Sequence, residues 1–360
     1  MCRSSIERGP ATPVDVGILG ATGVVGQRLA SLLDHHPWFR LVWVGASDRS
    51  AGQRYGSLSW RAPGDAPACV RDRVVSSCDP SGAPRVVFSA LDAAAAESLE
   101  PTFAAAGHVV ISNARSWRMD RLTPLVVPEI NPHHLDLLAD QRRARGWDGA
   151  IVTNPNCSTV FLAMTLHALS AFGVERVVVS TQQALSGAGH PGVASLDATA
   201  NVIPFIPGEE PKIETETAKI LGTLEPGGIR PHPTRISATA TRVPVLEGHV
   251  EVVSVELAAS PALEDVEAAF ARFRGECPPG LPSAPERPIE LALNDDRPQP
   301  RLDCERGRGM TVVVGRLRPC PALGYKFVAL GHNLIRGAAG AALLNAELML
   351  ARGLLPVAPR

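Results

Sequence analysis

Short apolar runs alternate with Gly-rich turns and helix-like stretches over the first 155 residues of the chain. The runs that predict β-strands cover residues 14–19, 41–46, 85–90 and 108–112. Between them lie stretches with the apolar or Ala-rich character of helices, including residues 27–33 and 93–106. Strands that alternate with helices in this way are typical of a parallel, doubly wound sheet. The first part of the chain is therefore predicted to be an α/β domain.

A different pattern begins near residue 155. Residues 157–171 are strongly apolar and follow a polar turn, which is typical of a helix. Strand-like runs follow at 174–181, 236–243, 250–257, 310–316 and 326–330. The segments 201–222 and 275–301 contain much loop, although the end of the first can be helical. Strands separated by such long excursions predict a second, α+β domain with a largely antiparallel or mixed sheet. A last, amphipathic helix is predicted over residues 338–352.

The composition excludes several classes of protein. The 35 Lys+Arg and 36 Asp+Glu residues give a net charge of −1, so the chain has no basic field for nucleic acid or for a membrane surface. Aromatic residues make up only 4% of the 360 residues, too few for base-stacking platforms. No apolar run is long enough to span a bilayer, and the polar tail over residues 1–13 lacks the apolar region of a secretory signal. We therefore expect a cytoplasmic protein without nucleic-acid or membrane partners.

The cysteine and histidine spacings do not indicate a metal site. The seven cysteines are odd in number, and no two form a close Cys-x-x-Cys pair, which argues against a disulfide framework or a zinc ribbon. The paired histidines His35/His36 and His133/His134 sit beside prolines in turns and have no metal-ligand spacing. The sequence therefore predicts no bound metal.

A Gly-rich turn follows the first predicted strand. Gly20, Gly23 and Gly26 have the spacing G-x-x-G-x-x-G and open the first predicted helix. Glycines allow a tight turn and a close approach of the backbone to a pyrophosphate, while the helix N-terminus supplies free N–H groups. This placement predicts a dinucleotide site, and the alternative is a packing turn without a ligand.

The end of the second predicted strand indicates which dinucleotide binds. An acidic residue there binds the ribose 2′-hydroxyl of NAD, whereas an arginine accommodates the 2′-phosphate of NADP. The segment contains both, as Asp48 and Arg49, between Ser47 and Ser50. The hydroxyls around Arg49 favour NADP. Asp48 leaves some use of NAD open, and a solvated surface loop is the remaining alternative.

Cys157 is the candidate nucleophile. It lies in Asn-Pro-Asn-Cys-Ser-Thr, a polar turn that runs into a helix, so its thiolate would be stabilised by the helix N-terminus. The alternative is a buried structural cysteine. A thiolate nucleophile requires an acid/base partner. His249 is the candidate, because it and Arg242 flank a short Pro/Gly turn between two predicted strands and could both face a cleft.

These residues resemble the aspartate-semialdehyde dehydrogenase family, specifically its archaeal and fungal-like branch. The matching segments occur in the family order from Val14 to about Ala351. They are GATGVVG (20–26), ASDRSAGQRYG (46–56), VFSAL (87–91), SNARSWRM (112–119), VVPEIN (126–131), NPNCST (154–159), QALSGAG (183–189), NVIPFIPGEEPKIETETAKILG (201–222), RVPVLEGH (242–249), LPSAPERPI (281–289), RPQPRLD (297–303) and GHNLIRGAAG (331–340).

The resemblance implies two domains and an oligomer. Residues 1–156 would form a Rossmann-type NADP-binding domain, completed by a C-terminal helix at about 331–360. Residues 157–330 would form the catalytic and dimerisation domain. A homodimer or a homotetramer is expected.

The resemblance also implies roles for individual residues. Cys157 would be the nucleophile, His249 the general acid/base, and Gln183 the residue that orients the acyl group. The expected substrate-binding residues are Arg242 for the α-carboxylate, Glu216 for the ammonium, Lys219 and Arg118 for phosphate, and Asn156. The expected cofactor-binding residues are Gly20, Ala21, Thr22, Gly23, Val24, Val25, Ser47, Arg49, Ser50, Ser89 and Ala90, with Ser186, Gly187 and Asn333 at the nicotinamide half.

The implied reaction is the reductive dephosphorylation of L-aspartyl-4-phosphate to L-aspartate 4-semialdehyde through a thioester on Cys157. Malonyl-CoA reductase, which resembles the same branch, would keep Cys157 and His249 but release CoA. N-acetyl-glutamyl-phosphate reductase would use the same chemistry with a different pocket. A non-catalytic NADP-binding sensor is the alternative outside enzymes, and the set of Cys157, Gln183 and His249 argues against it.

Overall fold

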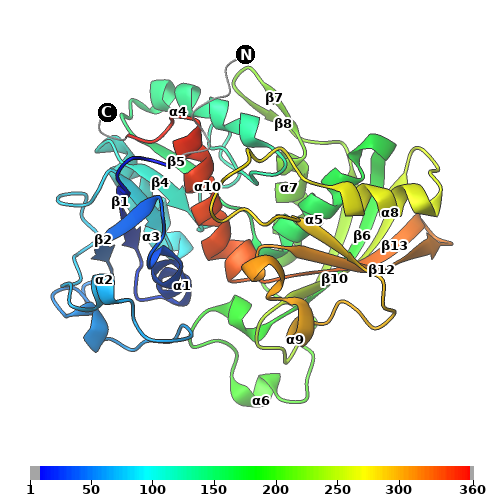
Figure 1. Cartoon of the computed structure of the whole chain (residues 1–360), viewed down its shortest axis with the longest axis horizontal. Helices are drawn as coiled ribbons and strands as arrows, with labels where there is room; N and C mark the ends of the chain where they lie inside the picture. Colours follow the sequence, from blue (N-terminus) through cyan, green and yellow to red (C-terminus); the bar gives the residue numbers. More distant parts are fainter. Residues whose placement is uncertain (1–8, 357–360) are drawn as a thin grey trace.

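The computed structural model describes residues 9–356, which form two large β-sheets with their covering helices and a small two-stranded sheet (Figure 1). Cys2 and the first part of the expected N-terminal tail lie outside the described residues. Within residues 9–356, no helix is long and apolar enough to cross a membrane.

The first sheet is parallel and has five strands in the order β2-β1-β3-β4-β5. These strands are β1 (Val14–Leu19), β2 (Phe39–Gly45), β3 (Val86–Ser89), β4 (Val109–Ser112) and β5 (Ala150–Thr153). Four of them were predicted. A parallel sheet that is covered on both faces has strands that are apolar at almost every position, which is why these runs were visible in the sequence. β5 was missed, although it is as long as β3 and β4.

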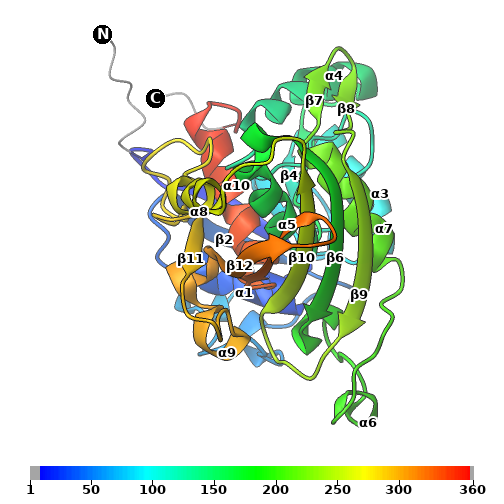
Figure 2. The same cartoon turned by 90° about the vertical axis from the view of Figure 1, so that its right-hand side faces the viewer.

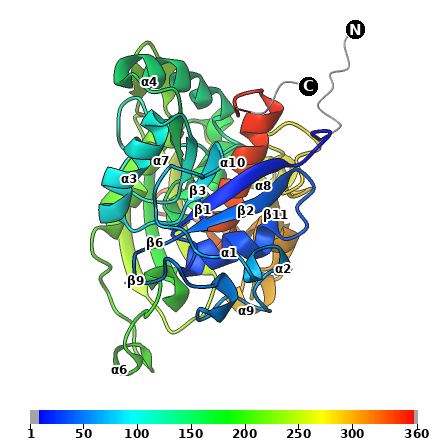
Figure 3. The same cartoon turned by 90° about the vertical axis from the view of Figure 1, so that its left-hand side faces the viewer.

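Helices from both ends of the chain cover this sheet. Helices α1 (Val24–Leu33) and α10 (Gly340–Ala351) contribute to the apolar cluster on one face. Helix α3 (Ala93–Ala105) contributes to the cluster on the other face (Figure 3). The C-terminal helix thus completes the core that the first strands begin, and the sheet is doubly wound, as predicted.

The second sheet is mixed and has six strands in the order β11-β12-β13-β10-β6-β9. The strands are β6 (Val174–Gln183), β9 (Arg235–Arg242), β10 (His249–Leu257), β11 (Ile289–Ala292), β12 (Val312–Cys320) and β13 (Gly324–Gly331). The pairs β6–β9 and β11–β12 are parallel, and the other pairs are antiparallel. Helices α5 (Cys157–Ala168) and α8 (Leu263–Arg272) pack on one face. The broad sheet that contains β10, β6 and β9 faces the viewer in Figure 2. Val178 of β6 and Val252 of β10 are exposed.

The remaining elements are short or connect the two sheets. They are η2 (Tyr55–Ser57), α2 (Ala68–Arg71), η3 (Pro132–Asp136), α4 (Leu137–Arg145), η4 (Ser170–Phe172), η5 (Leu185–Ala188), α6 (Ser195–Ala198), α7 (Glu209–Ile220), the hairpin β7 (Thr223–Glu225) and β8 (Gly228–Arg230), α9 (Pro300–Asp303), η6 (Arg306–Gly309) and the π-helical turn η7 (Ile335–Ala339).

Helix α7 occupies the end of the segment 201–222, the part that the sequence analysis allowed to be helical. Its first turn contains Glu209 and Glu210, which complement the positive helix N-terminus. Pro211 lies in the same turn, where the missing N–H breaks no helical hydrogen bond. The polar face of this helix borders the candidate active site, so few of its positions show the apolar periodicity of a core helix.

Candidate active site

Cys157 is the first residue of α5, as expected from the sequence. The side chain of Asn156 caps the helix, since its Oδ1 accepts hydrogen bonds from the backbone N–H groups of Ser158 (3.0 Å) and Thr159 (3.2 Å). Gly337 of η7 packs against the cysteine so closely that a Cβ at this position would lie 2.6 Å from the Cβ of Cys157. The cap and this contact fix the position of the cysteine backbone.

The surroundings of Cys157 keep its thiol protonated when no substrate is bound. Burial and, to a smaller extent, the carboxylate of Glu209 raise the pKa of the thiol, which lies at about 12. The cations Lys212, Arg118 and Arg242 act in the opposite direction. The polar turn and the helix N-terminus had instead predicted a stabilised thiolate. Burial and a neighbouring carboxylate outweigh that effect here.

Glu209 lies at the centre of a hydrogen-bonded group beside Cys157. Its Oε1 accepts from the Nδ2 of Asn156 (2.7 Å) and from the Nε2 of Gln183 (3.0 Å), and its Oε2 pairs with Lys212. Burial alone would raise the pKa of Glu209, but Lys212 and the two amides lower it below its usual value. The group therefore holds a carboxylate and an ammonium next to the nucleophile.

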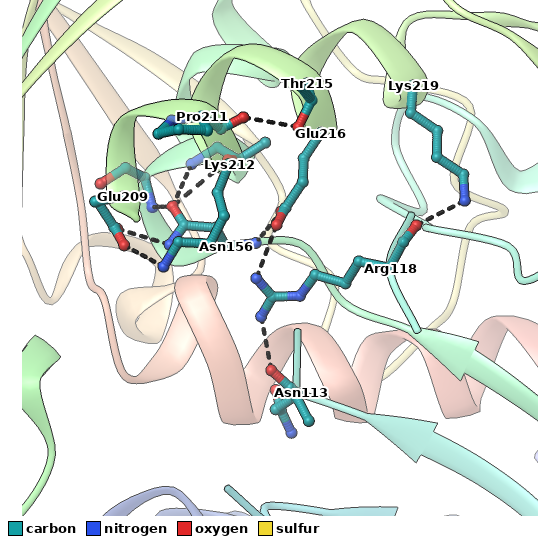
Figure 4. A network of polar contacts seen from close by, with 12 residues as sticks. Asn113, Arg118, Asn156, Glu209, Pro211, Lys212, Thr215, Glu216 and Lys219 are labelled. Carbon is teal, nitrogen blue, oxygen red and sulfur yellow. Dashed lines mark hydrogen bonds and ion pairs between the residues drawn. The ribbon is translucent and has the colours of Figure 1, made fainter. Parts of the chain in front are cut away.

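Glu209 and Lys212 were missed as site residues. The signal was present, because residues 209, 212, 216 and 219 repeat at intervals of three and four, which places them along one side of a helix. Figure 4 shows these four side chains along α7. The predicted site residues Glu216 and Lys219 are the second Glu–Lys pair on this side of α7. Glu209 and Lys212 are the first pair.

Glu216 and Arg118 form a buried ion pair further along α7. The Nη1 of Arg118 lies 3.1 Å from the Oε1 of Glu216, whose Oε2 accepts from the backbone N–H of Asn156 (2.6 Å). The Nη2 of Arg118 donates to the carbonyl of Asn113 (2.6 Å), while its buried Nε has no hydrogen-bond partner. Arg118 thus reaches the site from the first sheet, with one donor unused.

Lys219 lies behind the segment that carries Arg118. Its ammonium donates to three backbone carbonyls, those of Arg118 (2.6 Å), Asp120 (2.8 Å) and Thr123 (2.9 Å). An ammonium has three donors, so all of them are used. The structure therefore does not bring Lys219 into the group around Cys157, where a phosphate residue was expected.

His249 begins β10 and is fully buried. Its Nδ1 accepts a hydrogen bond from the backbone N–H of Ala184 (3.0 Å), so a neutral ring carries its proton on Nε2. That Nε2 has no partner within residues 9–356. Burial and, to a smaller extent, Arg242 lower the pKa of His249, which lies at about 3. The site therefore contains a neutral imidazole with an available Nε2–H donor.

Arg242 ends β9, as the sequence suggested. It is 6% exposed, and its Nη1 donates to the carbonyl of Ala184 (2.8 Å). No carboxylate of the described chain pairs with it. A buried guanidinium without an anion is unfavourable, so this position suits a carboxylate brought by a ligand. Gly187 of η5 packs against both this arginine and His249.

The Gly-rich turn has the geometry of a dinucleotide site. Gly20 has φ +73°, and a Cβ there would lie 2.6 Å from the carbonyl oxygen of Ala90. At Gly26 a Cβ would lie 2.3 Å from the carbonyl oxygen of Gly20. Gly23 precedes α1 without a side-chain cap, and the nearest atom to its Cβ position lies 3.5 Å away. The open start of α1 therefore fits a cofactor phosphate.

The other expected cofactor residues lie at the carboxyl ends of the neighbouring strands. Arg49 follows β2 and is exposed, as are Ser47 and Asp48. Ser89 ends β3, and its buried Oγ has no hydrogen-bond partner. Ligands of doubly wound folds bind at this edge of the sheet.

Asn333 follows β13 and links two segments that border the site. Its Oδ1 accepts from the backbone N–H of Gly248 (2.9 Å), and its Nδ2 donates to the Oγ of Ser186 (2.8 Å). It therefore joins the turn before His249 to η5, which contains Gly187.

One group within residues 9–356 has the composition of a metal site. It consists of Glu247, Glu305 and His332, whose potential ligand atoms lie within 4.8 Å of one another. The Nδ1 of His332 accepts from the backbone N–H of Leu334 (3.3 Å), which leaves the proton of a neutral ring on Nε2. A protonated Nε2 cannot bind a metal, so the absence of a metal stays our prediction.

The fold and the site together define a two-domain, nucleotide-dependent semialdehyde dehydrogenase. The model of the semialdehyde dehydrogenase NAD-binding domain matches residues 15–138, and that of the semialdehyde dehydrogenase dimerisation domain matches residues 166–336. The first match covers the region of β1 to β4, and the second covers the six-stranded sheet.

Similar proteins identify the particular family. The aspartate-semialdehyde dehydrogenase of Archaeoglobus fulgidus is 48% identical over 337 residues, which cover 93% of this chain and 97% of that protein. That of Cryptococcus neoformans is 47% identical over 363 residues, covering 96% and 99%. The crystal structure of the Candida albicans enzyme with NADP has a TM-score of 0.88 at 40% identity, covering 95% of this chain and 100% of that one. The chain belongs to the aspartate-semialdehyde dehydrogenase family.

Proposed function

We propose that this chain catalyses the NADP-dependent reductive dephosphorylation of L-aspartyl-4-phosphate to L-aspartate 4-semialdehyde. The observation that supports this most is the grouping of a helix-capped Cys157, an unpartnered Nε2–H on His249 and a buried Arg242 without an anion. These three features supply a nucleophile, a proton donor and a carboxylate site. The family membership supports the same function and does not favour the malonyl-CoA reductase alternative.

In the proposed reaction, the sulfur of Cys157 attacks the acyl carbon of the substrate. The C–O bond to phosphate breaks, the thiol proton leaves with the phosphate, and a thioester forms on Cys157. The cofactor supplies the hydride that reduces this thioester. His249 hydrogen-bonds the developing oxyanion through its Nε2–H and gives it a proton, which the ring recovers from solvent; its fixed tautomer supports this role. The C–S bond then breaks, which releases the aldehyde and returns the proton to the sulfur.

The substrate contacts follow from the charges that surround Cys157. We propose that Arg242 binds the α-carboxylate, because a guanidinium binds a carboxylate through two parallel hydrogen bonds. Glu209 and Lys212 act on the thiol electrostatically, which supports them as the residues that meet the substrate ammonium and phosphate. Arg118 would be the second phosphate residue through its unused Nε. In this proposal Glu216 positions Arg118.

Two lysine variants test this assignment. We expect Lys212→Ala to raise the KM for phosphate at least about tenfold in the reverse direction, because a charged hydrogen bond contributes on the order of 1.5–3 kcal/mol. Lys219→Ala should instead lower the melting temperature, since three buried carbonyls lose their donor. An increase in the KM for phosphate only in Lys219→Ala would reverse the assignment.

The activity itself is tested with L-aspartate 4-semialdehyde and NADP, with phosphate alone or CoA alone. NADPH formation that requires phosphate is expected. Formation only with CoA would favour a malonyl-CoA reductase, and no formation with either would refute the proposed function.

We propose that the cofactor is NADP, held by the Gly-rich turn at residues 20–25 and by the loop at 47–50. The open start of α1 and the exposed Arg49 support this assignment. Ser89, Ala90, Ser186, Gly187 and Asn333 would line the remainder of the cofactor site. Arg49→Ala should raise the KM for NADP about tenfold or more and leave that for NAD unchanged, because only NADP has the 2′-phosphate.

We also propose that the chain divides into a cofactor-binding part, residues 1–156 with 331–360, and a catalytic and dimerisation part, residues 157–330. The separate clusters of apolar side chains around the two sheets support this division. A homodimer would use the open face of the six-stranded sheet, where Val178 is 52% and Val252 41% exposed. Val252→Glu should give monomers by light scattering if this face is the interface, and a tetramer of wild-type chains would reveal a second interface.

A cytoplasmic location is proposed as well. It is supported by the six cysteines of the described residues, which are all unpaired, as expected in a reducing compartment.

A further inference from the structure

An ion pair joins the cofactor-binding helix to the turn that carries the catalytic histidine. Arg28 lies on α1, two residues after the last glycine of the Gly-rich motif, and its Nη2 lies 2.9 Å from the Oε1 of Glu247. The two side chains are only 12% and 23% exposed, although 219 residues separate them in the sequence. The proposed reaction does not use either residue.

Glu247 is held from both sides. Its Oε2 lies 3.2 Å from the Nε2 of His332, which is fully buried at the end of β13. His332 and Arg28 lower the pKa of Glu247 below its usual value, so the carboxylate is charged at neutral pH. Glu247 is thus fixed between α1 and the six-stranded sheet.

The turn formed by residues 243–248 connects this carboxylate to His249. The backbone N–H groups of Leu185 and Ser186 donate to the carbonyls of Val245 (2.7 Å) and Leu246 (3.2 Å), so the turn and η5 form one unit. The same segment supplies the N–H of Ala184 that orients His249. A displacement at Glu247 would therefore reach both η5 and the imidazole.

We propose that Arg28 and Glu247 form a positioning pair. Through this pair, α1, which begins at the proposed phosphate site, fixes the turn 243–248 that precedes His249. It also fixes η5, which is hydrogen-bonded to that turn. The pair would thereby set the spacing between the two ends of the cofactor site. This inference rests on the proposed function, because the pair affects catalysis only through the role proposed for His249.

The test uses the full-length enzyme and the variants Arg28→Gln, Arg28→Lys, Glu247→Gln and the double variant Arg28→Gln/Glu247→Gln. We expect each Gln variant to lower kcat about tenfold, since a 1 Å misplacement of a catalytic group can cost on the order of 100-fold. The double variant should be no worse than either single one, because the two residues act as a unit. Arg28→Lys keeps the charge and should recover most of the activity.

Two readouts separate positioning from other roles. The dissociation constant for NADP, measured by fluorescence, should change less than about twofold, which is under 0.5 kcal/mol. Hydrogen exchange of residues 243–249 in the cofactor-free protein should be faster in Arg28→Gln than in the wild type. Arg40→Gln is the matched control, because Arg40 forms an exposed ion pair with Asp15 in the same part of the chain. This variant should change neither kcat nor the exchange rate of residues 243–249.

Other results would overturn the inference. If Arg28→Gln weakens NADP binding as much as it lowers kcat, Arg28 is a cofactor ligand. If kcat and the exchange rates stay at wild-type values, the pair has no positioning role. An inactive wild-type enzyme would instead refute the proposed function, so the two failures can be distinguished.

Discussion

Replacing Gly187 with alanine tests whether the active site depends on the close packing of η5 against its two key side chains. A Cβ at this position would lie 2.8 Å from the Nη1 of Arg242 and 3.0 Å from both the Cε1 and the Nε2 of His249. Ordinary contacts begin at 3.4 Å. The guanidinium must therefore move by about 0.6 Å and the imidazole by about 0.4 Å if the backbone of η5 stays in place.

These displacements predict the size of the effect on catalysis. If a 1 Å misplacement costs about 100-fold, shifts near 0.5 Å cost about tenfold for each group. We expect kcat to fall about tenfold through His249 and the KM for the semialdehyde to rise about tenfold through Arg242. The melting temperature should change little, because Gly187 itself is exposed.

Steady-state kinetics with varied semialdehyde at saturating NADP and phosphate measure both constants. Ala188→Ser is the matched control, since it adds a single atom to the next, exposed position of η5. A change in kcat/KM of less than threefold in Gly187→Ala would refute the reasoning. It would mean that η5 moves aside and that the packing on His249 and Arg242 does not define the site.

Three further predictions concern the nucleophile and the core. Cys157→Ala should abolish turnover and leave NADP binding unchanged, and loss of binding measured by calorimetry would mean that the nucleophile is misplaced. Because the pKa of the Cys157 thiol is raised to about 12, its alkylation by iodoacetamide should accelerate about tenfold per pH unit from pH 7 to 10, as followed by peptide mass spectrometry. A plateau below pH 9 would contradict this pKa, and Glu209→Gln should increase the rate at every pH. Glu129→Gln should destabilise the protein by about 3–5 kcal/mol in urea unfolding, because it leaves the fully buried guanidinium of Arg336 without its partner. The exposed pair of Glu225 with Arg230 provides the control, since Glu225→Gln should cost less than about 1 kcal/mol.

The fold could be predicted from the sequence where buried residues form continuous apolar runs along the chain. The strands of the parallel sheet are buried on both faces, so β1 to β4 were visible as apolar runs. α5 was visible for the same reason, because almost every one of its positions is buried. α7 has one side directed at a polar site, so it had no strong apolar pattern. β5 has the same length and burial as β3 and β4, so neither property explains why it was missed.

The site could be predicted where the chemistry is local to a motif. The cap of α5 by Asn156 is a contact between near neighbours, and the position of Cys157 followed from it. The choice between two Glu–Lys pairs on α7 was not local. The assignment that we propose depends on which turn of the helix faces Cys157, and on the hydrogen bonds of Lys219 to carbonyls about 100 residues away. The high thiol pKa likewise depends on burial by distant segments.

The contribution of α10 to the first core has a consequence for the way the protein is made. Leu343, Leu344 and Leu348 of this helix belong to the same apolar cluster as Val16 and Ile18 of β1. Because α10 follows β13 in the sequence, β1 completes its core only after the whole six-stranded sheet has been synthesised. Most domains can fold from the N-terminus during synthesis, but the first sheet here stays uncovered on one face until α10 has left the ribosome. A nascent chain, or one truncated before α10, would expose that apolar face.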